Sequence, residues 1–258
     1  MGMLPRRAVL LGGIAAVAAC APSPAGGPPD MGVTGEGRSR LSARPPAVRS
    51  GSTDPQPGVS VLDLGPGREV LLHVPSGMHD GAPARLVLTL HGAGGDARAG
   101  LGPLVPLADT YRLLLLAPPS QGRTWDVILG GWGPDVRRID DALEDVFASY
   151  PVDPQGLAIS GFSDGASYAL SLGLANADLF THILAFSPGF VMPVLPTGTP
   201  SVFVSHGRAD EVLPIDRTTR RIVPQLRSAG IPVEVHEFDG GHTIPAEIAE
   251  AAVRHLIG

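Results

Sequence analysis

A serine lies between two glycines in the segment Gly161-Phe162-Ser163-Asp164-Gly165. This spacing matches the pattern G-x-S-x-G, in which the serine stands on a sharp turn between a strand and a helix and acts as a nucleophile. The pattern arises easily by chance in a chain with 34 glycines among 258 residues. Here an apolar run at 157–160 predicts a strand before the serine, and residues 163–174 have the composition of a helix. We therefore predict that Ser163 is a nucleophile, and not only a glycine-flanked helix cap.

A serine hydroxyl needs a general base, and the base needs an acid that orients it. In α/β sheets that carry such a turn, the acid and then the histidine follow the serine along the chain. Three histidines lie late enough, namely His236, His242 and His255. The first falls inside a strand expected at 233–238, and the last inside a helix expected at 245–256. His242 follows that strand in a glycine-rich loop, and we predict it as the base.

The acid is expected at the carboxyl end of an earlier strand. Asp210 follows the apolar run 201–204 and precedes a helix expected at 215–229. Its neighbour Glu211 is a competing candidate, and Asp239 is closer to His242 but reads as a residue that braces its own loop. The strand expected at 183–186 is followed by no acidic residue. Asp210 is therefore the predicted acid.

Acyl transfer also needs backbone N–H donors that stabilise the oxyanion of the tetrahedral intermediate. We expect one from Asp164, the residue after the serine, and one from the loop His91-Gly92-Ala93-Gly94-Gly95. Ala93 is the first choice there and Gly94 the alternative. The loop could instead be a plain tight turn. A phosphate-binding loop would need a Lys and a Ser or Thr that the segment lacks.

These residues require a sheet that places them at one edge. Between residues 59 and 258, strand-like runs alternate with helix-like segments, which predicts an α/β fold with a mostly parallel central sheet and helices on both faces. Ligands bind such sheets at the carboxyl ends of the strands. Strands are expected at 59–64, 69–74, 86–90, 113–117, 157–160, 183–186, 201–204 and 233–238, and helices at 97–110, 134–150, 163–174, 215–229 and 245–256.

Two tryptophans, Trp125 and Trp132, lie in the loop 120–133 after an expected strand. They could line an acyl or aryl pocket, and they could equally be packing residues. Between Phe186 and Ser201 there is no room for a large lid, which predicts a fairly open pocket.

A metal site is not predicted. His91, Asp96, His206 and Asp239 could be imagined as ligands beside the candidate acid and base, but no close ligand pair supports this. Both His91 and His206 precede a glycine at a strand end, and we expect them to brace their loops by hydrogen bonds.

The N-terminal residues read as an export signal. In residues 1–20, Arg6-Arg7 precedes a short apolar stretch at 8–19 that ends at Cys20, the only cysteine in the chain. This ending resembles a bacterial lipobox, which implies cleavage before Cys20 and lipid attachment to it. The alternatives are an ordinary secretory signal and, more weakly, a twin-arginine signal. Residues 21–58, rich in Pro, Gly and Ser, predict a flexible linker, and residues 59–258 the catalytic domain.

The net charge of −6 and the absence of a Lys/Arg cluster argue against a nucleic-acid partner. Hydrophobic residues make up 43% and charged residues 17%, as in globular proteins. The expected membrane contact is the lipid anchor alone. The sequence does not indicate an oligomeric state.

Four motifs occur in a fixed order: His91-Gly92, the segment 161–165, Ser-His-Gly-x-x-Asp-x-x-Leu-Pro at 205–214 and Gly-Gly-His at 240–242. Together they resemble the phospholipase/carboxylesterase group of the α/β-hydrolases, which includes bacterial carboxylesterases and acyl-protein thioesterases. The resemblance implies the α/β-hydrolase fold and hydrolysis of esters or thioesters through an acyl-enzyme without a cofactor. It assigns Ser163, Asp210 and His242 as the triad and Ala93 and Asp164 as oxyanion donors.

One position departs from that group, because Asp164 carries a carboxylate where the group often has Gln. A weaker resemblance is to secreted polyhydroxybutyrate-depolymerase and feruloyl-esterase proteins. We expect an enzyme anchored in the cell envelope that acts on a small-molecule ester. The alternatives are a catalytically silent binding module with the same fold and a peptidase or amidase with the same triad.

Overall fold

The computed structural model describes residues 38–46, 56–67, 69–78 and 82–258. The expected signal segment 1–20 with Cys20, and most of the expected linker, lie outside the described residues. No helix in the described ranges is long and apolar enough to cross a membrane.

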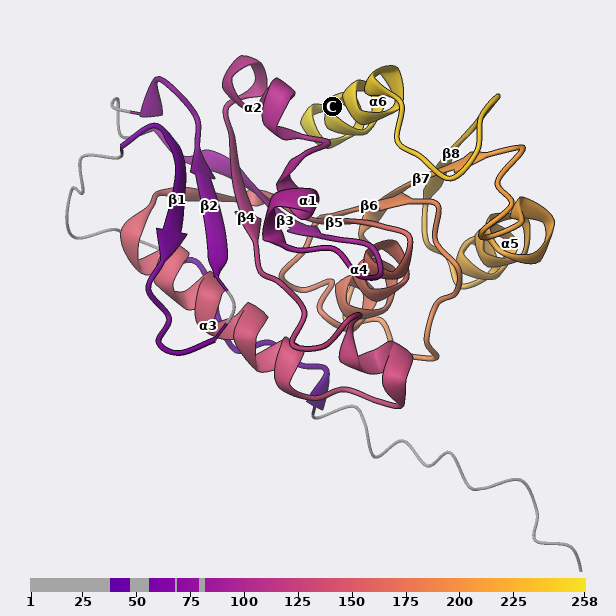
Figure 1. Cartoon of the computed structure of the whole chain (residues 1–258), viewed down its shortest axis with the longest axis horizontal. Coiled ribbons are helices and arrows are strands. Elements are labelled where there is room, and N and C mark those ends of the chain that lie inside the picture. The colour runs from indigo at the N-terminus through magenta and orange to yellow at the C-terminus, as the bar shows by residue number, and fades with distance from the viewer. Residues whose placement is uncertain (1–37, 47–55, 68, 79–81) are drawn as a thin grey trace, which may run out of the picture. The chain divides into compact units, whose positions relative to one another are not determined.

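In the described part of the chain, eight strands form one sheet in the order β1-β2-β4-β3-β5-β6-β7-β8 (Figure 1). Strands β1 and β2 are antiparallel to their neighbours, and all pairs from β4 to β8 are parallel. The expected mostly parallel α/β sheet is confirmed. The strands are β1 (Gly58–Leu62), β2 (Val70–Val74), β3 (Ala84–Leu90), β4 (Leu113–Ala117), β5 (Val152–Phe162), β6 (His182–Phe186), β7 (Ser201–Gly207) and β8 (Val233–Phe238).

Helices cover both faces of this sheet, as Figure 1 shows. Apolar residues of α3, α4 and α5 pack on one face, and those of α1, α2 and α6 pack on the other. The helices are α1 (Ala97–Leu101), α2 (Val105–Tyr111), α3 (Pro134–Ser149), α4 (Asp164–Ala175), α5 (Thr219–Ser228) and α6 (Ala246–Ile257), with short 3-10 turns η3 (Asp126–Leu129) and η4 (Ile215–Arg217).

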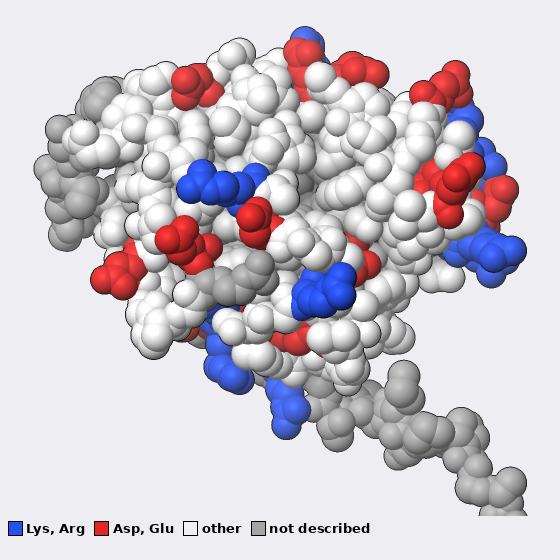
Figure 2. Space-filling view, viewed as in Figure 1, with Lys and Arg blue, Asp and Glu red and all other residues white. Residues whose placement is uncertain are grey.

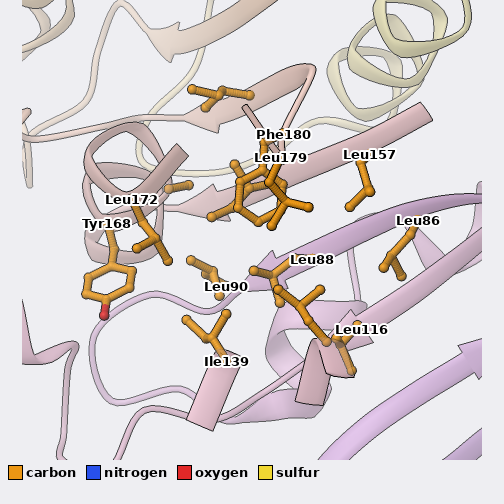
Figure 3. Packing of buried hydrophobic residues seen from close by; sticks show 14 of the residues in the cluster. Leu86, Leu88, Leu90, Leu116, Ile139, Leu157, Tyr168, Leu172, Leu179 and Phe180 are labelled. Carbon is orange, nitrogen blue, oxygen red and sulfur yellow. The ribbon is translucent and has the colours of Figure 1, made fainter. Parts of the chain in front are cut away.

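The central strands are buried on both faces because helices cover each side, and their sequences are correspondingly apolar throughout. In β3, alternate residues face opposite layers, so that Leu88 and Leu90 join one core cluster and Val87 the other. Figure 3 shows the first cluster, in which Ile139 of α3 and Leu172 of α4 lie against these strand leucines. Burying each such side chain contributes about 1.5–3 kcal/mol, and this packing fixes the strand ends that carry the polar residues.

Three elements differ from expectation for local reasons. The helix expected at 97–110 is two helices, α1 and α2, separated around Pro103. The helix expected at 215–229 begins as the 3-10 turn η4, and the non-helical dihedral angles of Thr218 (φ −123°, ψ −101°) separate it from α5. Strand β5 starts at Val152, earlier than expected. The residues 153–155 that follow it are Asp, Pro and Gln, and they interrupt the apolar run from which a strand is predicted.

Residues 38–46, expected to belong to the flexible linker, pack against the domain. Leu41 and Ala43 are buried in the main core cluster. The Leu41 N–H donates to Asn176 Oδ1 (2.9 Å), and Asn176 Nδ2 donates to the Ser39 carbonyl (2.7 Å). Arg40 and Asp178 form a salt bridge at 2.8 Å. For these nine residues the expectation of a free linker is wrong, because a buried amide and apolar contacts hold a segment whose composition is polar.

Asn176 is the side chain on which this docking depends most, since it is fully buried and bonds the segment through both ends of its amide. We predict that Asn176→Ala lowers the free energy of unfolding by about 2 kcal/mol, because the buried Leu41 N–H loses its partner. Urea unfolding followed by circular dichroism measures this, and trypsin should cleave faster after Arg40. Asp178→Asn, which weakens a half-exposed ion pair, should cost under about 1 kcal/mol. An unchanged urea midpoint in Asn176→Ala would show that the segment is not held in this way.

Candidate active site

Ser163 occupies the turn between β5 and α4, as its sequence motif predicts. Its backbone has φ 56° and ψ −117°, a conformation that residues other than glycine rarely adopt. A Cβ on Gly161 would lie 2.2 Å from the Gly165 carbonyl oxygen, and a Cβ on Gly165 would lie 2.4 Å from the Leu90 carbonyl oxygen. Both glycines are therefore required by the close approach of β5, α4 and the end of β3. Strain of this kind persists only where the surroundings over-determine it, which is common at functional sites.

The loop that follows β3 lies directly beside this serine. A Cβ on Gly92 would come within 3.4 Å of the Ser163 Cβ. The Gly94 N–H donates to the Arg123 carbonyl at 2.6 Å, so it is not available as an oxyanion donor. In the described part of the chain, no hydrogen bond is found for the N–H of Ala93 or of Asp164. Of the two loop candidates, the geometry thus favours Ala93.

The carboxylate of Asp164 has a partner that the sequence did not suggest. The Thr124 hydroxyl donates to Asp164 Oδ2 at 2.6 Å. Thr124 lies 40 positions earlier in the chain, in the loop after β4, and no motif marks it. The contact holds the carboxylate to one side while the Asp164 N–H remains at the first turn of α4.

Two carboxylates, the buried Asp135 and the half-buried Asp126, shape the loop that presents Thr124. The Asp126 N–H donates to Asp135 Oδ2 (2.8 Å), and the Asp135 N–H donates to Asp126 Oδ2 (2.9 Å). Tyr168 of α4 also donates its hydroxyl to Asp126 Oδ1 (3.1 Å). Burial raises the pKa of Asp126, and these hydrogen bonds partly offset that rise. The reciprocal pair closes the loop 120–133 and ties it to the helix that begins at the serine.

Asp210 and His242 meet at the carboxyl ends of β7 and β8. His242 Nδ1 lies 2.6 Å from Asp210 Oδ2, and the Asp210 side chain is wholly buried. The other oxygen, Oδ1, accepts the N–H groups of Val212 (2.9 Å) and Leu213 (2.8 Å). Burial by itself would raise the pKa of Asp210, but the hydrogen bonds from Leu213 and His242 outweigh it, so that the pKa is lowered. A charged carboxylate is what a base-orienting acid requires.

The competing acids point elsewhere. Glu211 is exposed, and Asp239, whose side chain is 93% exposed, forms a surface salt bridge with Arg208 at 2.8 Å. The structure therefore brings Asp210, and neither of these two residues, to His242.

The two loops that carry Asp210 and His242 are locked together by their backbones. The Ala209 N–H donates to the Gly240 carbonyl (2.9 Å), and a Cβ on Gly207 would lie 2.3 Å from the Gly241 carbonyl oxygen. Glycine at 207 is thus a condition for the contact between the loops. The glycine of the segment Ser-His-Gly thus lets the backbone of the segment Gly-Gly-His lie directly against it.

His242 lies next to the turn that carries the serine. Its ring packs on the ring of Phe162, with 4.6 Å between centroids, and Phe162 immediately precedes Ser163. Among the described residues, no hydrogen bond joins the Ser163 hydroxyl to His242. Such bonds are often long in resting enzymes and shorten when a substrate is bound.

The bracing roles expected for His91 and His206 are confirmed. His91 Nε2 accepts the Ser120 N–H at 3.0 Å, which ties the loop after β3 to the loop after β4. His206 is fully buried, with Nδ1 2.7 Å from the Thr219 hydroxyl and Nε2 2.7 Å from the Leu213 carbonyl.

The two tryptophans differ. Trp125 is 0% exposed, donates Nε1–H to the His91 carbonyl (2.9 Å) and packs against Tyr168. The suggestion that it contacts substrate is therefore wrong, because no part of its ring reaches the surface. Trp132 is half-buried and lines a cavity of about 510 Å³ with Arg38, Val136 and Arg137, among others. None of the three triad candidates lines that cavity, so a substrate contact of Trp132 stays a prediction.

Another serine, histidine and carboxylate lie within hydrogen-bond distance of one another at the amino ends of β7 and β8. His255 Nε2 is 2.9 Å from the Ser201 hydroxyl, and His255 Nδ1 is 2.7 Å from Glu234 Oε2. Ser201, however, begins a strand instead of a helix, and its N–H donates to the Thr181 carbonyl. It lacks the positive φ of Ser163 and the helix N-terminus that would favour an oxyanion. The spacing of three polar groups thus does not by itself define a hydrolytic site.

Among the described residues, no group of three or more His, Cys, Asp or Glu side chains is arranged to hold a metal ion. The histidines and carboxylates at the strand ends instead bond to one another and to the backbone.

The known proteins to which this chain is similar in sequence are esterases. Residues 136–257 match the Phospholipase/Carboxylesterase family model. A probable feruloyl esterase C of Aspergillus terreus is 28% identical over 158 residues, which are 58% of this chain and 57% of that protein. The feruloyl esterase C of Emericella nidulans is 29% identical over 160 residues, with the same coverage. The chain thus spans a little over half the length of these curated relatives.

Solved structures share the fold. The esterase PE8 superposes with a TM-score of 0.58 at 24% identity, over 72% of this chain and 96% of that one. A butyrate-bound thermophilic esterase of the Planctomycetes species Thermogutta terrifontis gives 0.60 at 17% identity, over 78% and 94% of the two chains. The solved structures show that this chain has their fold, and the family match and the curated relatives show that its sequence is similar to esterases.

Proposed function

We propose that the protein is a serine hydrolase that cleaves carboxylic esters through an acyl-enzyme on Ser163. The observation that carries this proposal is the buried 2.6 Å contact between His242 and Asp210, beside a serine held with φ 56° at a helix N-terminus. Neither feature is needed for a stable sheet. Together they supply the nucleophile, the base and the orienting acid of acyl transfer.

In the first step, His242 Nε2 takes the proton of the Ser163 hydroxyl while Oγ attacks the ester carbonyl carbon. The carbonyl oxygen becomes an oxyanion that accepts the N–H groups of Ala93 and Asp164. The imidazolium of His242 then gives its proton to the leaving alkoxide, and the acyl group remains on Ser163. Water repeats the sequence, with His242 as base, and releases the carboxylic acid.

The buried Asp210 holds His242 in the tautomer that leaves Nε2 unprotonated, and its charge stabilises the imidazolium. The hydrogen bonds from the backbone of residues 212 and 213 keep it ionised. No cofactor enters this mechanism.

The substrate class is a small-molecule ester, with thioesters and amides as less favoured alternatives for the same triad. The names of the curated relatives favour an aryl-substituted acyl group such as a hydroxycinnamoyl ester. The segment between β6 and β7 contains no helix that could act as a lid, which supports an open entrance. On the face drawn in Figure 2, acidic and basic side chains are scattered and interspersed. This arrangement gives little support to binding of a polyanion.

We further propose that the protein is exported and attached to a membrane surface through a lipid on Cys20. The support is the sequence alone, namely Arg6-Arg7, the short apolar stretch and the only cysteine at its end. Mass spectrometry of the protein from its native membrane fraction tests this, because a diacylglyceryl adduct on Cys20 is expected and an unmodified Cys20 would contradict it.

Ser163→Ala is predicted to abolish turnover of p-nitrophenyl and hydroxycinnamoyl esters. Loss of a triad serine leaves only the residual catalysis of the oxyanion donors, a decrease of about 10⁶-fold in kcat in well-studied hydrolases. A fluorophosphonate probe should label the wild-type protein once, at Ser163.

Ser201→Ala is the matched control, since it removes the serine that contacts His255 at 2.9 Å and should leave turnover unchanged. A wild-type protein that neither hydrolyses esters nor reacts with the probe would favour the silent binding module. A Ser163→Ala protein with wild-type activity would refute the assignment of the nucleophile.

The decrease of kcat/KM at low pH should correspond to the uptake of no more than one proton. Because the pKa of Asp210 lies below its usual value, this carboxylate remains charged over the range in which histidine titrates. As pH falls, kcat/KM should drop with a slope no steeper than one in a logarithmic plot, because Asp210 takes up no proton in this range. A slope of two would mean that Asp210 also takes up a proton there.

Thr124→Val should lower kcat about tenfold, because it frees the Asp164 carboxylate beside the developing oxyanion; a tenfold effect corresponds to about 1.4 kcal/mol. The double variant Thr124→Val/Asp164→Asn retains the N–H of residue 164 but removes the charge, and should recover most of the loss. Steady-state kinetics on one ester measures both. If the double variant is as slow as the single one, the effect is not electrostatic.

A further inference from the structure

The acid of the proposed triad has a second histidine partner. His206 Nε2 lies 3.2 Å from Asp210 Oδ2, the same oxygen that faces His242 at 2.6 Å. The side chains of His206 and Asp210 are both fully buried. Asp210 and His242 are the charged or titratable groups that act on His206.

The neighbours of His206 determine where its proton lies. Nε2 is 2.7 Å from the Leu213 carbonyl, which can only accept, so Nε2 carries a hydrogen. Burial lowers the pKa of His206, which favours the neutral ring. Nδ1 is then an acceptor, and the Thr219 hydroxyl donates to it at 2.7 Å. The single N–H of the ring thus faces Leu213 and Asp210, on the side of His206 opposite Thr219.

This arrangement completes the hydrogen bonding of the acid. Two backbone N–H groups bond to Oδ1, and His242 Nδ1 lies 2.6 Å from Oδ2. His206 Nε2–H, whose nearer acceptor is the Leu213 carbonyl, makes a longer contact of 3.2 Å with the same oxygen. His206 also holds the carbonyl of Leu213, whose N–H bonds to Asp210 Oδ1. The turn 210–213 is therefore closed at both ends by one histidine, and the carboxylate has no freedom to rotate.

We propose that His206 is a positioning residue, which acts through Asp210 to fix the orientation and the basicity of His242. The proposal rests on the proposed ester hydrolysis, because it concerns the same triad. His206 is buried and does not touch substrate, so its effect should be on kcat and not on KM. In metal sites, residues that support a ligand in this way contribute about 10- to 100-fold to activity, and we expect an effect of that order here.

A merely structural histidine would behave differently. If His206 only stabilised the loop, its replacement would lower the stability of the domain and leave the kinetics of the folded protein unchanged. If it positions the acid, loss of its N–H leaves more negative charge on Asp210 Oδ2 for His242. The protonated form of His242 then becomes more favourable, and the acid limb of kcat/KM moves to higher pH.

The test compares three variants of the full chain. His206→Met fills a similar volume without a donor, and we expect a decrease of kcat of about tenfold or more, an unchanged KM and an acid limb about 0.5–1 pH unit higher. His206→Gln keeps a side-chain N–H near Nε2 and should restore most of kcat. Thr219→Val is the matched control, because it removes a buried bond to His206 but leaves the contact with Asp210.

A second measurement does not depend on activity, and its first part needs no variant. Nitrogen NMR of the histidine side chains in the wild-type protein should show His206 as the neutral Nε2–H tautomer, and a low-field proton for the His242 Nδ1–H bond to Asp210. In His206→Met that proton should shift. A protonated His206, or its Nδ1–H tautomer, at the pH of full activity would overturn the proposal even if the Met variant failed to fold.

The two proposals fail in distinguishable ways. If wild type hydrolyses esters, Ser163→Ala does not, and folded His206→Met keeps the wild-type kcat and acid limb, only the positioning role is refuted. The role is likewise refuted if Thr219→Val lowers kcat as much as His206→Met. If wild type has no hydrolytic activity but His206→Met shifts the low-field proton, the positioning role stands and the proposed function falls.

Discussion

The hydrogen bond between His242 and Asp210 depends on almost every other feature of the C-terminal half of this fold. It joins two loops that follow neighbouring parallel strands, and these loops approach so closely because residue 207 is a glycine, whose Cβ would lie 2.3 Å from the Gly241 carbonyl oxygen. A buried carboxylate is costly unless it is fully hydrogen-bonded. Here two backbone N–H groups and His242 supply that bonding, and His206 contacts the same carboxylate at 3.2 Å. The cost of burying the charge is thus offset locally, and the histidine gains a fixed orientation.

The serine is placed by a different constraint, the packing of β5 and α4 against the end of β3. Gly161, Gly165 and Gly92 allow three backbones to converge, and Ser163 adopts its unusual φ where they meet. Phe162 connects the two halves of the site, since its ring packs on His242 while its backbone leads into the serine. Ser163 and Ser201 differ in backbone context, and this difference is the reason that Ser163 and not Ser201 is the proposed nucleophile.

The sequence was sufficient to predict the parallel sheet and the strand ends at which Ser163, Asp210 and His242 lie. Apolar runs bounded by glycine and proline mark buried strands, and the order of the motifs restricts the choice of partners. Thr124 could not be predicted, because its contact with Asp164 joins residues 40 positions apart through a loop whose shape depends on Asp126 and Asp135.

Two other expectations failed because composition does not report tertiary contacts. An aromatic residue in a loop at a strand end can face a pocket or the core, and Trp125 faces the core. The segment 38–46 reads as polar linker, yet Leu41 is buried and the buried Asn176 bonds the backbone on either side of Arg40. A side chain that satisfies a distant backbone leaves no periodic signal in the sequence.

The central claim is that an acyl group is transferred to Ser163, and the most direct measurement is the mass of the protein during turnover. Wild-type protein mixed with a slowly hydrolysed aryl ester and quenched in acid should gain the mass of one acyl group. Fragmentation of the peptide between Arg138 and Arg208 should locate that group on Ser163 and not on Ser201. An ester that is hydrolysed without any adduct, or an adduct on Ser201, would contradict the account.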